Sequence, residues 1–346
     1  MKIILMLLAS LLSAIPASAQ TRSLELKNTG YQLENGAITL AHQGQFIDPY
    51  FAIRALLSAH SAGMDIEHAA LAYIAWQLPR QEANGLFKRY CLEQELAPQA
   101  SAPQDSAQHA LPESAAVWRA CADADADDAL LAMWIELLYL MAPNQGLPPE
   151  WKKSVLSARS QLALIYDKTR GIYLISRSNR VGLLMDNIEI YAALRSTAEQ
   201  QKRLGLHQLA QKSALQAKQL ELAIQKVFRP SRQGDFRIST QAPEASRFYP
   251  EQVGQVFAPL FGMRVGQMDA KKSGQHTLSK WLDEHQVAWL AHEKDHFPWG
   301  LIALAAEKNE AQDTARLWVE RALPLRNGER WNVLEEAIFQ ALSGNQ

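Results

Sequence analysis

The stretch CADADADDALLAMWIELLYL, from Cys121 to Leu140, places four aspartates directly before a segment that is almost entirely apolar. Crowded carboxyl groups raise one another's pKa, so that one can donate a proton while another acts as base or nucleophile. Asp127 and Asp128, at the start of the apolar helix, are therefore the first catalytic candidates. The alternative is structural, because a helix N-terminus attracts negative charge and either aspartate could cap it.

Asp186 is a third carboxylate at the start of an apolar segment, in LLMDNIEIYAALR. Glu189 follows three residues later, which is the spacing of a capping box. Asp48 precedes Pro49, and this pair of residues indicates an N-cap and a first helical position. Considered alone, each carboxylate is better explained as a cap than as a catalyst, so the arrangement of the helices must decide.

The helices that carry these carboxylates alternate with helices of a different kind. Six apolar segments open near Asp48, Asp127, Asp186, Pro250, Pro298 and Trp331, and helices with a charged face lie between them. A helix that is apolar on all sides is buried, whereas one with a polar face is peripheral. The alternation predicts an all-α (α/α)6 toroid with an inner and an outer ring. An α-solenoid is disfavoured because its repeats would have nearly constant length.

Three irregularities in this ring are expected. The chain stops at Gln346 without an outer partner for the last inner helix, so the last hairpin is expected to be incomplete. A small β-hairpin is expected in GIYLISRSNRVGLLM, turning at Ser178-Asn179. The Pro-, Gln- and Ser-rich residues 96–116 are interpreted as an irregular surface loop. Residues 20–346 are therefore expected to form a single catalytic-type domain.

The N-terminal sequence MKIILMLLASLLSAIPASAQ contains Lys2, an apolar run, and small residues at Ala17 and Ala19. It predicts a signal peptide over residues 1–19, cleaved after Ala19, because the apolar run is too short to span a bilayer comfortably. A periplasmic or secreted protein follows, with no membrane insertion after cleavage. Export permits a disulfide between Cys91 and Cys121, although two separate thiols remain the alternative.

The formal net charge of −1 supplies no attraction for nucleic acid or an acidic membrane. The hydrophobic fraction of 48% is enough for one large core or two ordinary ones. Nucleic acid is therefore not predicted as a partner, and no cofactor is predicted.

Three stretches resemble the six-hairpin glycosidase superfamily over most of the chain: DADADDALLAMWIELLY, LLMDNIEIYAALR, and FYPEQVGQVFAPLFG with FPWGLIALAA. Secreted α-mannanases of this superfamily carry a catalytic Asp-Asp pair at the start of an inner helix, and Asp127-Asp128 is similar. The bulky aromatic pair usual after that motif is replaced here by Ala129-Leu130-Leu131. Its unsaturated-uronide hydrolases use single aspartates on inner helices, and Asp186 resembles one of those. The resemblance implies carbohydrate chemistry without identifying the sugar.

In such a toroid the inner helices run parallel, so their N-termini meet at one rim. Glycoside hydrolysis needs two carboxyl groups about 5–5.5 Å apart for retention or about 6.5–9.5 Å apart for inversion, and sugars stack on aromatic rings. Arg89 could bind substrate or neutralise the carboxylates, and a disulfide would hold it beside them. We expect a rim with catalytic Asp127, Asp128 and Asp186, and with substrate-binding Asp48, Tyr50, Arg89, Tyr191, Tyr249, Glu251 and Trp299.

Two other functions fit parts of the sequence. A non-catalytic toroid could bind polysaccharide or a partner protein during envelope polymer export. AHEKDHF contains the zinc-protease motif H-E-x-x-H at His292, Glu293 and His296. Pro298 and the two charged residues inside the motif oppose a zinc-binding helix, so no metal is predicted. The favoured function is an exported glycoside hydrolase acting on a polysaccharide or oligosaccharide.

Overall fold

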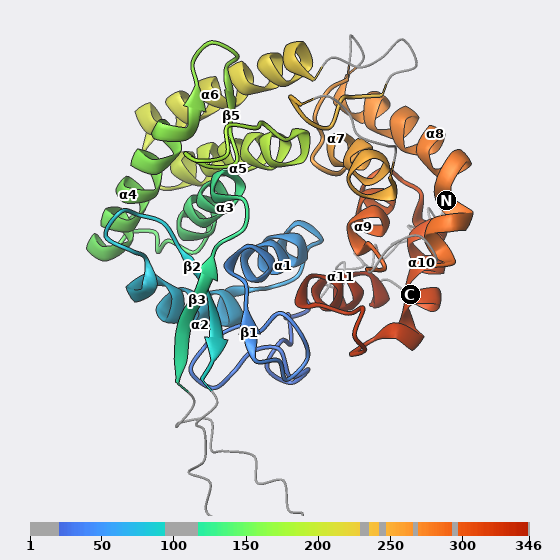
Figure 1. Ribbon diagram of the computed structural model, residues 1–346, viewed down its shortest axis with the longest axis horizontal. Coiled ribbons are helices and arrows are strands. Elements are labelled where there is room, and N and C mark those ends of the chain that lie inside the picture. The colour runs from blue at the N-terminus through green and yellow to red at the C-terminus, as the bar shows by residue number, and fades with distance from the viewer. Residues whose placement is uncertain are drawn as a thin grey trace, which may run out of the picture.

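The computed structural model describes residues 21–93, 117–228, 235–241, 247–265, 269–292 and 297–344. Its helices form two concentric rings (Figure 1). The inner ring consists of α1 (Pro49–Ser61), α3 (Asp127–Leu140), α5 (Leu184–Arg203), α7 (Phe257–Leu260), α9 (Gly300–Lys308) and α11 (Val333–Ser343). The outer ring consists of α2 (Glu67–Gln77), α4 (Pro149–Ile165), α6 (His207–Val227), α8 (Ala270–Leu290) and α10 (Gln312–Ala322). Consecutive inner helices contact each other and α11 closes the ring against α1, so the predicted (α/α)6 toroid is confirmed. The predicted signal peptide and the loop at 96–116 lie outside the described residues.

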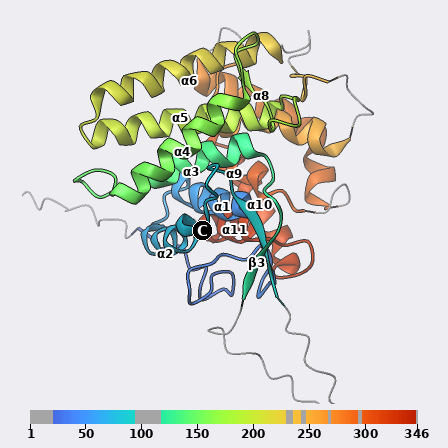
Figure 2. The ribbon, with the colours of Figure 1, turned by 60° about the vertical axis from the view of Figure 1, so that its left-hand side comes forward.

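The sequence pattern of each ring explains its burial. Every residue of α9 from Gly300 to Ala306 is buried, as expected for a helix that is apolar on all sides. The outer helix α6 buries one face only, with residues such as Ala210, Ala217 and Ile224 pointing inward. Figure 2 shows the outer helices α4 and α6 beside the inner helices α3 and α5. The alternation of the two helix types therefore positions the inner N-termini.

The fourth inner position is less regular than predicted. In place of one helix opening at Pro250, the chain forms a π turn (Phe248–Gln252), a 3₁₀ turn (Val253–Val256) and the short α7. Tyr249 is extended (φ −110°, ψ 132°), because a residue before proline is disfavoured in the helical region. The Tyr249 side chain therefore points in a different direction from the one it would take in a continuous helix.

Two small sheets decorate the rings. Strands β1 (Phe46–Ile47), β2 (Lys88–Leu92) and β3 (Trp118–Asp123) form an antiparallel sheet in that order, which the sequence did not predict. Strands β4 (Tyr166–Asp167) and β5 (Ile172–Tyr173) pair as a second sheet. The chain does turn at Ser178-Asn179, where the Ser176 amide donates to Asn179 O at 3.2 Å. The Ile175 amide also donates to Val181 O at 2.9 Å, so the predicted turn forms, and the regular pairing of β4 with β5 lies before it in the chain.

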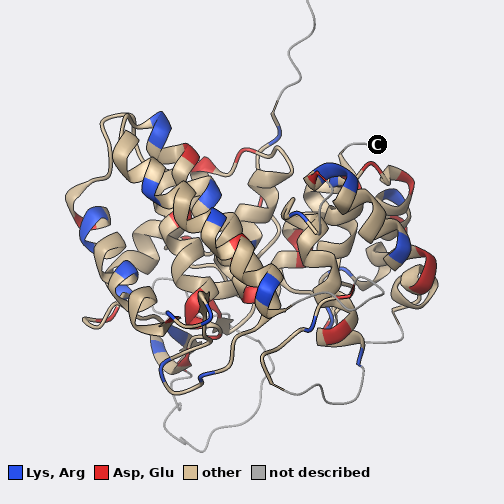
Figure 3. Ribbon diagram, turned by 90° about the horizontal axis from the view of Figure 1, so that it is seen from above, with Lys and Arg blue, Asp and Glu red and all other residues tan. Residues whose placement is uncertain are grey.

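Charged residues of both signs are interspersed over the side of the molecule shown in Figure 3. This mixture agrees with the near-neutral net charge of −1. In the part of the chain that the structure describes, no helix combines the length and apolarity that crossing a membrane requires.

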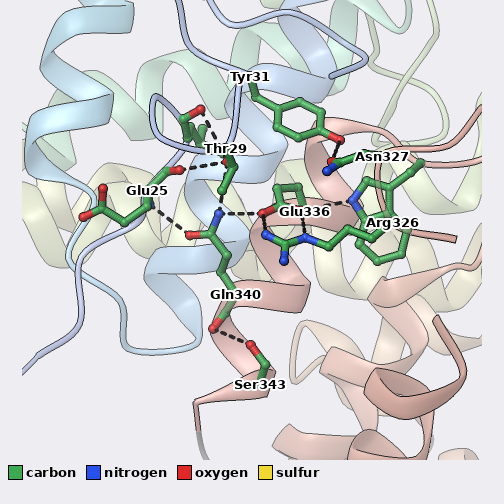
Figure 4. A network of polar contacts seen from close by, with 10 residues as sticks. Glu25, Thr29, Tyr31, Arg326, Asn327, Glu336, Gln340 and Ser343 are labelled. Atoms are coloured by element: carbon green, nitrogen blue, oxygen red, sulfur yellow. Dashed lines mark hydrogen bonds and ion pairs between the residues drawn. The ribbon is translucent and has the colours of Figure 1, made fainter. Parts of the chain in front are cut away.

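The N-terminal segment 21–47 fills the outer place beside α11, where the expected hairpin is incomplete (Figure 4). The Val333 amide donates to Leu40 O at 2.8 Å, and the Glu25 amide donates to Gln340 Oε1 at 2.9 Å. The Tyr31 hydroxyl reaches Asn327 Oδ1 at 3.1 Å, just before α11. The same segment also contacts α2, and it therefore completes the outer ring with irregular chain in place of a helix.

Candidate active site

The N-terminal turns of α1, α3 and α5 meet at one rim of the ring. The Tyr50 hydroxyl in α1 donates to Glu189 in α5, with 3.0 Å to Oε1. The carboxyl groups of Asp128 in α3 and Asp186 in α5 are close enough to share a hydrogen bond. Asp128, Asp186 and Glu189 therefore form one buried group, called here the carboxyl cluster.

Asp128 and Asp186 form a dyad inside this cluster. Asp128 is fully buried and Asp186 is 7% exposed. Asp128 Oδ1 accepts from the Ala129 amide at 2.9 Å, whereas Oδ2 of each aspartate accepts no hydrogen bond from any described donor. A hydrogen bond between two carboxyl groups requires a proton on one of them. Buried and unpartnered Oδ2 atoms on two neighbouring carboxyl groups therefore favour a dyad that retains a proton.

The pKa values of Asp128 and Asp186 also favour a retained proton. Burial raises the pKa of Asp128 to about 7, and the nearby Glu189 carboxylate adds to this effect. Burial also raises the pKa of Asp186 well above its usual range, followed by repulsion from Asp128 and Glu189. Two like charges this close cannot both ionise without a large cost. At neutral pH the dyad can consequently act as a proton donor.

Glu189 is held by two partners from α1. The Arg54 Nε atom lies 3.4 Å from Glu189 Oε1, and both side chains are almost completely buried. Burial raises the pKa of Glu189, while Arg54 and the Tyr50 hydroxyl lower it in part. The cluster thus contains three carboxyl groups and one close guanidinium, so its negative charge is only partly balanced.

Asp127 occupies a different environment from Asp128. It is partly exposed at the start of α3, and Ala126 before it has a left-handed backbone with φ 46°. Burial and the neighbouring Asp123 raise the pKa of Asp127 to about 6, while Lys88 lowers it. At neutral pH Asp127 is therefore mainly ionised and accessible to water.

The disulfide holds a basic residue beside this rim. Cys91 in β2 and Cys121 in β3 are joined, with their Cα atoms 5.8 Å apart, so the predicted disulfide is confirmed. Arg89 in β2 donates from Nε to Asp48 Oδ2 at 2.7 Å, and its Nη2 lies 3.4 Å from Asp125 Oδ2. In the structure Arg89 therefore neutralises two aspartates of the rim.

The capping predictions are confirmed for one helix and wrong for another. Asp48 caps α1 as predicted, because its side chain accepts from the Tyr50 amide. The predicted capping box at Asp186 and Glu189 does not form, since the N-cap of α5 is Leu183 and no side chain caps it. Their carboxyl groups instead face side chains of other helices: Glu189 contacts Tyr50 and Arg54 of α1, and Asp186 lies close to Asp128 of α3. Neither Asp186 nor Glu189 is explained by helix capping.

Tyr249 and Trp299, which were predicted to bind substrate at the rim, stack on each other. Their rings are stacked, with centroids 4.9 Å apart and planes at 22°. Tyr249 is 46% exposed, and its hydroxyl interacts electrostatically with that of Tyr50. The stack therefore lies near the carboxyl cluster and offers a ring face to solvent.

Two predicted binding residues have other surroundings. Tyr191 is buried in α5, where the Arg195 Nη1 atom donates to its hydroxyl at 3.4 Å. Glu251 accepts from the Arg247 amide at 3.3 Å within its own turn. Tyr191 and Glu251 were predicted at the rim because they lie near the starts of inner segments. In the structure each side chain contacts a residue four positions away in the sequence.

Glu335 is a buried carboxyl group that the sequence analysis missed. It follows the N-cap Asn332 in α11, and its Oε2 accepts from the Gly300 amide at 2.7 Å. Burial raises the pKa of Glu335 to about 8. This bond fixes the start of α9 directly after Trp299, whose backbone is left-handed with φ 52°. A glutamate inside the apolar run VLEEAIF was the available signal.

The H-E-x-x-H motif can be assessed only at its first residue, because Glu293 and His296 lie outside the described residues. His292 lies in a turn after α8 with φ 54°, so it does not continue that helix. Among the described residues no group of three or more His, Cys, Asp or Glu is placed to hold a metal ion.

Comparison with solved structures finds the same fold in a glycoside hydrolase. The chain resembles the GH63 mannosylglycerate hydrolase from Thermus thermophilus, solved in complex with glucose. The TM-score is 0.53 and the identity 11%, over 93% of this chain and 98% of that one. An uncharacterized conserved protein from the same organism gives a TM-score of 0.52 at 11% identity, with the same coverage.

No protein-family model and no curated protein matches the sequence. The structural matches nevertheless show that this chain shares its fold with a glycoside hydrolase, in agreement with the (α/α)6 toroid. The function must be argued from the site itself, because one fold supports many activities.

Proposed function

We propose that the protein is a glycoside hydrolase that acts on a polysaccharide or oligosaccharide at the rim beside the carboxyl cluster. The observation that carries this proposal is the buried carboxyl pair Asp128 and Asp186 at the starts of α3 and α5, whose raised pKa values favour a retained proton. A general acid of this kind is what glycosidic bond cleavage requires. The fold shared with a mannosylglycerate hydrolase supports the same conclusion.

The roles follow from exposure and charge. Asp186 is the proton donor, because it is 7% exposed whereas Asp128 is fully buried. Asp128 is a positioning residue that keeps the shared proton on the dyad. Asp127 acts as the base that activates water, since its pKa of about 6 leaves it ionised at neutral pH. The dyad supplies only one acid, so the second carboxylate must come from outside it.

Substrate binding is assigned to the aromatic stack. The exposed face of Tyr249, supported by Trp299, suits the apolar C–H face of a sugar ring. Tyr50 connects this surface to Glu189 through its hydroxyl. A sugar bound on the stack would therefore lie on the side of the cluster where α1 and α5 meet.

Export is part of the proposal. The N-terminal sequence has the pattern of a cleaved signal peptide. The Cys91–Cys121 disulfide supports an oxidising compartment, because disulfides persist in the periplasm and outside the cell. We therefore propose a periplasmic or secreted enzyme.

The alternative is a non-catalytic toroid that binds polysaccharide or a partner protein. The complete burial of Asp128 favours it, because the substrate cannot touch this residue directly. The exposed Tyr249–Trp299 stack would serve binding without turnover equally well. Only turnover separates the two functions.

The test measures hydrolysis of a panel of oligosaccharides by the wild type and by Asp186→Asn. The variant should lose turnover by about 10²–10⁴-fold, as expected for removal of a general acid, while still binding the substrate. Asp283→Asn, at an exposed position in α8, is the matched control and should retain full activity. Turnover that survives in Asp186→Asn would refute its role, and a wild type that binds but hydrolyses nothing would establish the non-catalytic function.

A further inference from the structure

Figure 2 shows the outer helices α4 and α6. A groove of about 380 Å³ is lined by residues of both helices. Its floor is apolar and comes from the inner helices, with Ala132 and Ile135 from α3 and Ile190 and Leu194 from α5. The carboxyl cluster is formed by the N-terminal turns of inner helices, so this groove is a separate feature.

The groove is lined by three cations without a balancing anion. Arg159 comes from α4, Lys168 from the β4–β5 turn and Lys212 from α6. None of them forms an ion pair with a carboxylate of the described residues, and none of the described lining residues is Asp or Glu. Nearby Asp167 is already paired with Arg170 at 2.7 Å. A concave surface lined by one sign of charge concentrates the opposite charge.

The remaining lining suits a sugar. Tyr166 and Tyr173 contact each other with ring centroids 5.0 Å apart and planes at 54°. Gln216 and Gln219 from α6 add amide groups that can donate to and accept from hydroxyls. The volume falls within the range of small-molecule sites, which is about 300–1,000 Å³.

The groove is pre-formed by hydrogen bonds to the inner ring. The Tyr173 amide donates to Asn187 Oδ1 at 2.8 Å, and Asn187 Nδ2 donates back to Tyr173 O at 3.0 Å. Asn187 is completely buried in the first part of α5. Tyr173 is therefore fixed in place, and a ligand would not need to order it.

We propose that this groove is a second saccharide-binding site, specific for an acidic saccharide. The anionic substituents lie toward Arg159, Lys168 and Lys212, and a sugar ring packs on Tyr166 and Tyr173. Three uncompensated cations give no advantage to a neutral sugar, whereas a uronate gains charge-assisted hydrogen bonds from them. Binding at this site does not depend on hydrolysis at the rim.

The experiment uses the full protein carrying Asp186→Asn, so that a probe is not consumed, and measures binding by titration calorimetry. Trigalacturonate is the acidic probe, maltotriose the neutral one, and inorganic phosphate the free anion. Lys168→Gln with Lys212→Gln should weaken trigalacturonate binding by at least about tenfold, because two charge-assisted contacts are lost. Lys153→Gln with Lys218→Gln, which changes the same charge at exposed positions outside the groove, should leave it unchanged.

Several outcomes would overturn the proposal. They are failure of trigalacturonate to bind, equal binding of maltotriose, equal weakening by the control pair, and phosphate binding as tight as that of trigalacturonate. Thermal unfolding of both double variants establishes that any loss is not due to unfolding. The proposed hydrolase activity is tested separately, since wild type and the Lys168/Lys212 variant should hydrolyse a short neutral substrate at the same rate.

Discussion

Replacing Asp128 by Asn should make the protein more stable at neutral and alkaline pH. The pKa of Asp128 is raised from 3.8 to about 7 by burial. Between these two pH values the unfolded chain has lost the proton of this carboxyl group and the folded protein keeps it. The free energy of unfolding therefore falls as the pH rises through this interval. Asparagine has nearly the same shape and does not titrate, so the variant escapes this loss.

The size of the effect follows from the shift. One pKa unit corresponds to about 1.4 kcal/mol, and the shift from 3.8 to about 7 therefore corresponds to roughly 4 kcal/mol. At acidic pH, where the carboxyl group is protonated in both states, the variant and the wild type should be similarly stable. The side-chain amide introduced by Asp128→Asn can also donate to Asp186 Oδ2, which accepts no hydrogen bond from a described donor in the wild type.

Urea unfolding, followed by tryptophan fluorescence from about pH 4.5 to about pH 8.5, measures this difference directly. The wild-type free energy of unfolding should fall more steeply with pH than that of Asp128→Asn. Asp125→Asn is the control, since the Asp125 side chain is 63% exposed and should alter the slope little. An Asp128→Asn variant with the wild-type slope, or with lower stability at alkaline pH, would refute a protonated dyad and indicate an ordinary helix cap.

Four further predictions concern the same rim. Tyr50→Phe removes the donor to Glu189 and should lower stability by about 1–3 kcal/mol in urea unfolding; unchanged stability would contradict the bond. Arg54→Met leaves Glu189 without its cation and should cost about 3–5 kcal/mol at alkaline pH. The loss should be smaller at acidic pH, where Glu189 is protonated, and a pH-independent loss would argue against this cause. Reducing the disulfide should cost about 3–4 kcal/mol, measured by thermal unfolding with and without reductant. Hydrolysis should rise with pH as Asp127 ionises near its pKa of about 6 and fall once the dyad loses its proton. Asp127→Asn should remove the acidic limb of that profile, and an unchanged limb would exclude Asp127 as the base.

The helices were predictable from sequence because their signals are local. Pro49 and Pro149 stand at helix starts, and the alternation of fully apolar and one-sided helices separates the inner from the outer ring. The start of α3 at Asp127 was also correct. The irregular fourth position was not predicted, because the succession of π, 3₁₀ and α turns depends on packing around Tyr249-Pro250.

The composition of the site could be predicted only in part. Sequence placed Asp128 and Asp186 at inner-helix starts, but the closeness of their carboxyl groups depends on how α3 and α5 pack. Arg54 and Glu335 are charged residues inside apolar runs, which is a signal that pattern reading can detect but that does not reveal their partners. The contact of Tyr191 with Arg195 could have been predicted, because residues four apart on a helix lie on the same face.

Burial and pairing distinguish the carboxyl groups proposed to be catalytic from those that cap a helix. Asp48 has a structural role, because it caps α1 and forms an ion pair with Arg89. Asp186 and Glu189 cap nothing, and the Arg54 guanidinium pairs with Glu189 alone among the three carboxyl groups of the cluster. Burying such groups costs stability, and apolar residues of similar volume would be equally good or better at filling the space. A carboxyl cluster that is kept at the start of the inner helices at this cost agrees with the proposed proton transfer, in which Asp186, at 7% exposure, is the proposed donor.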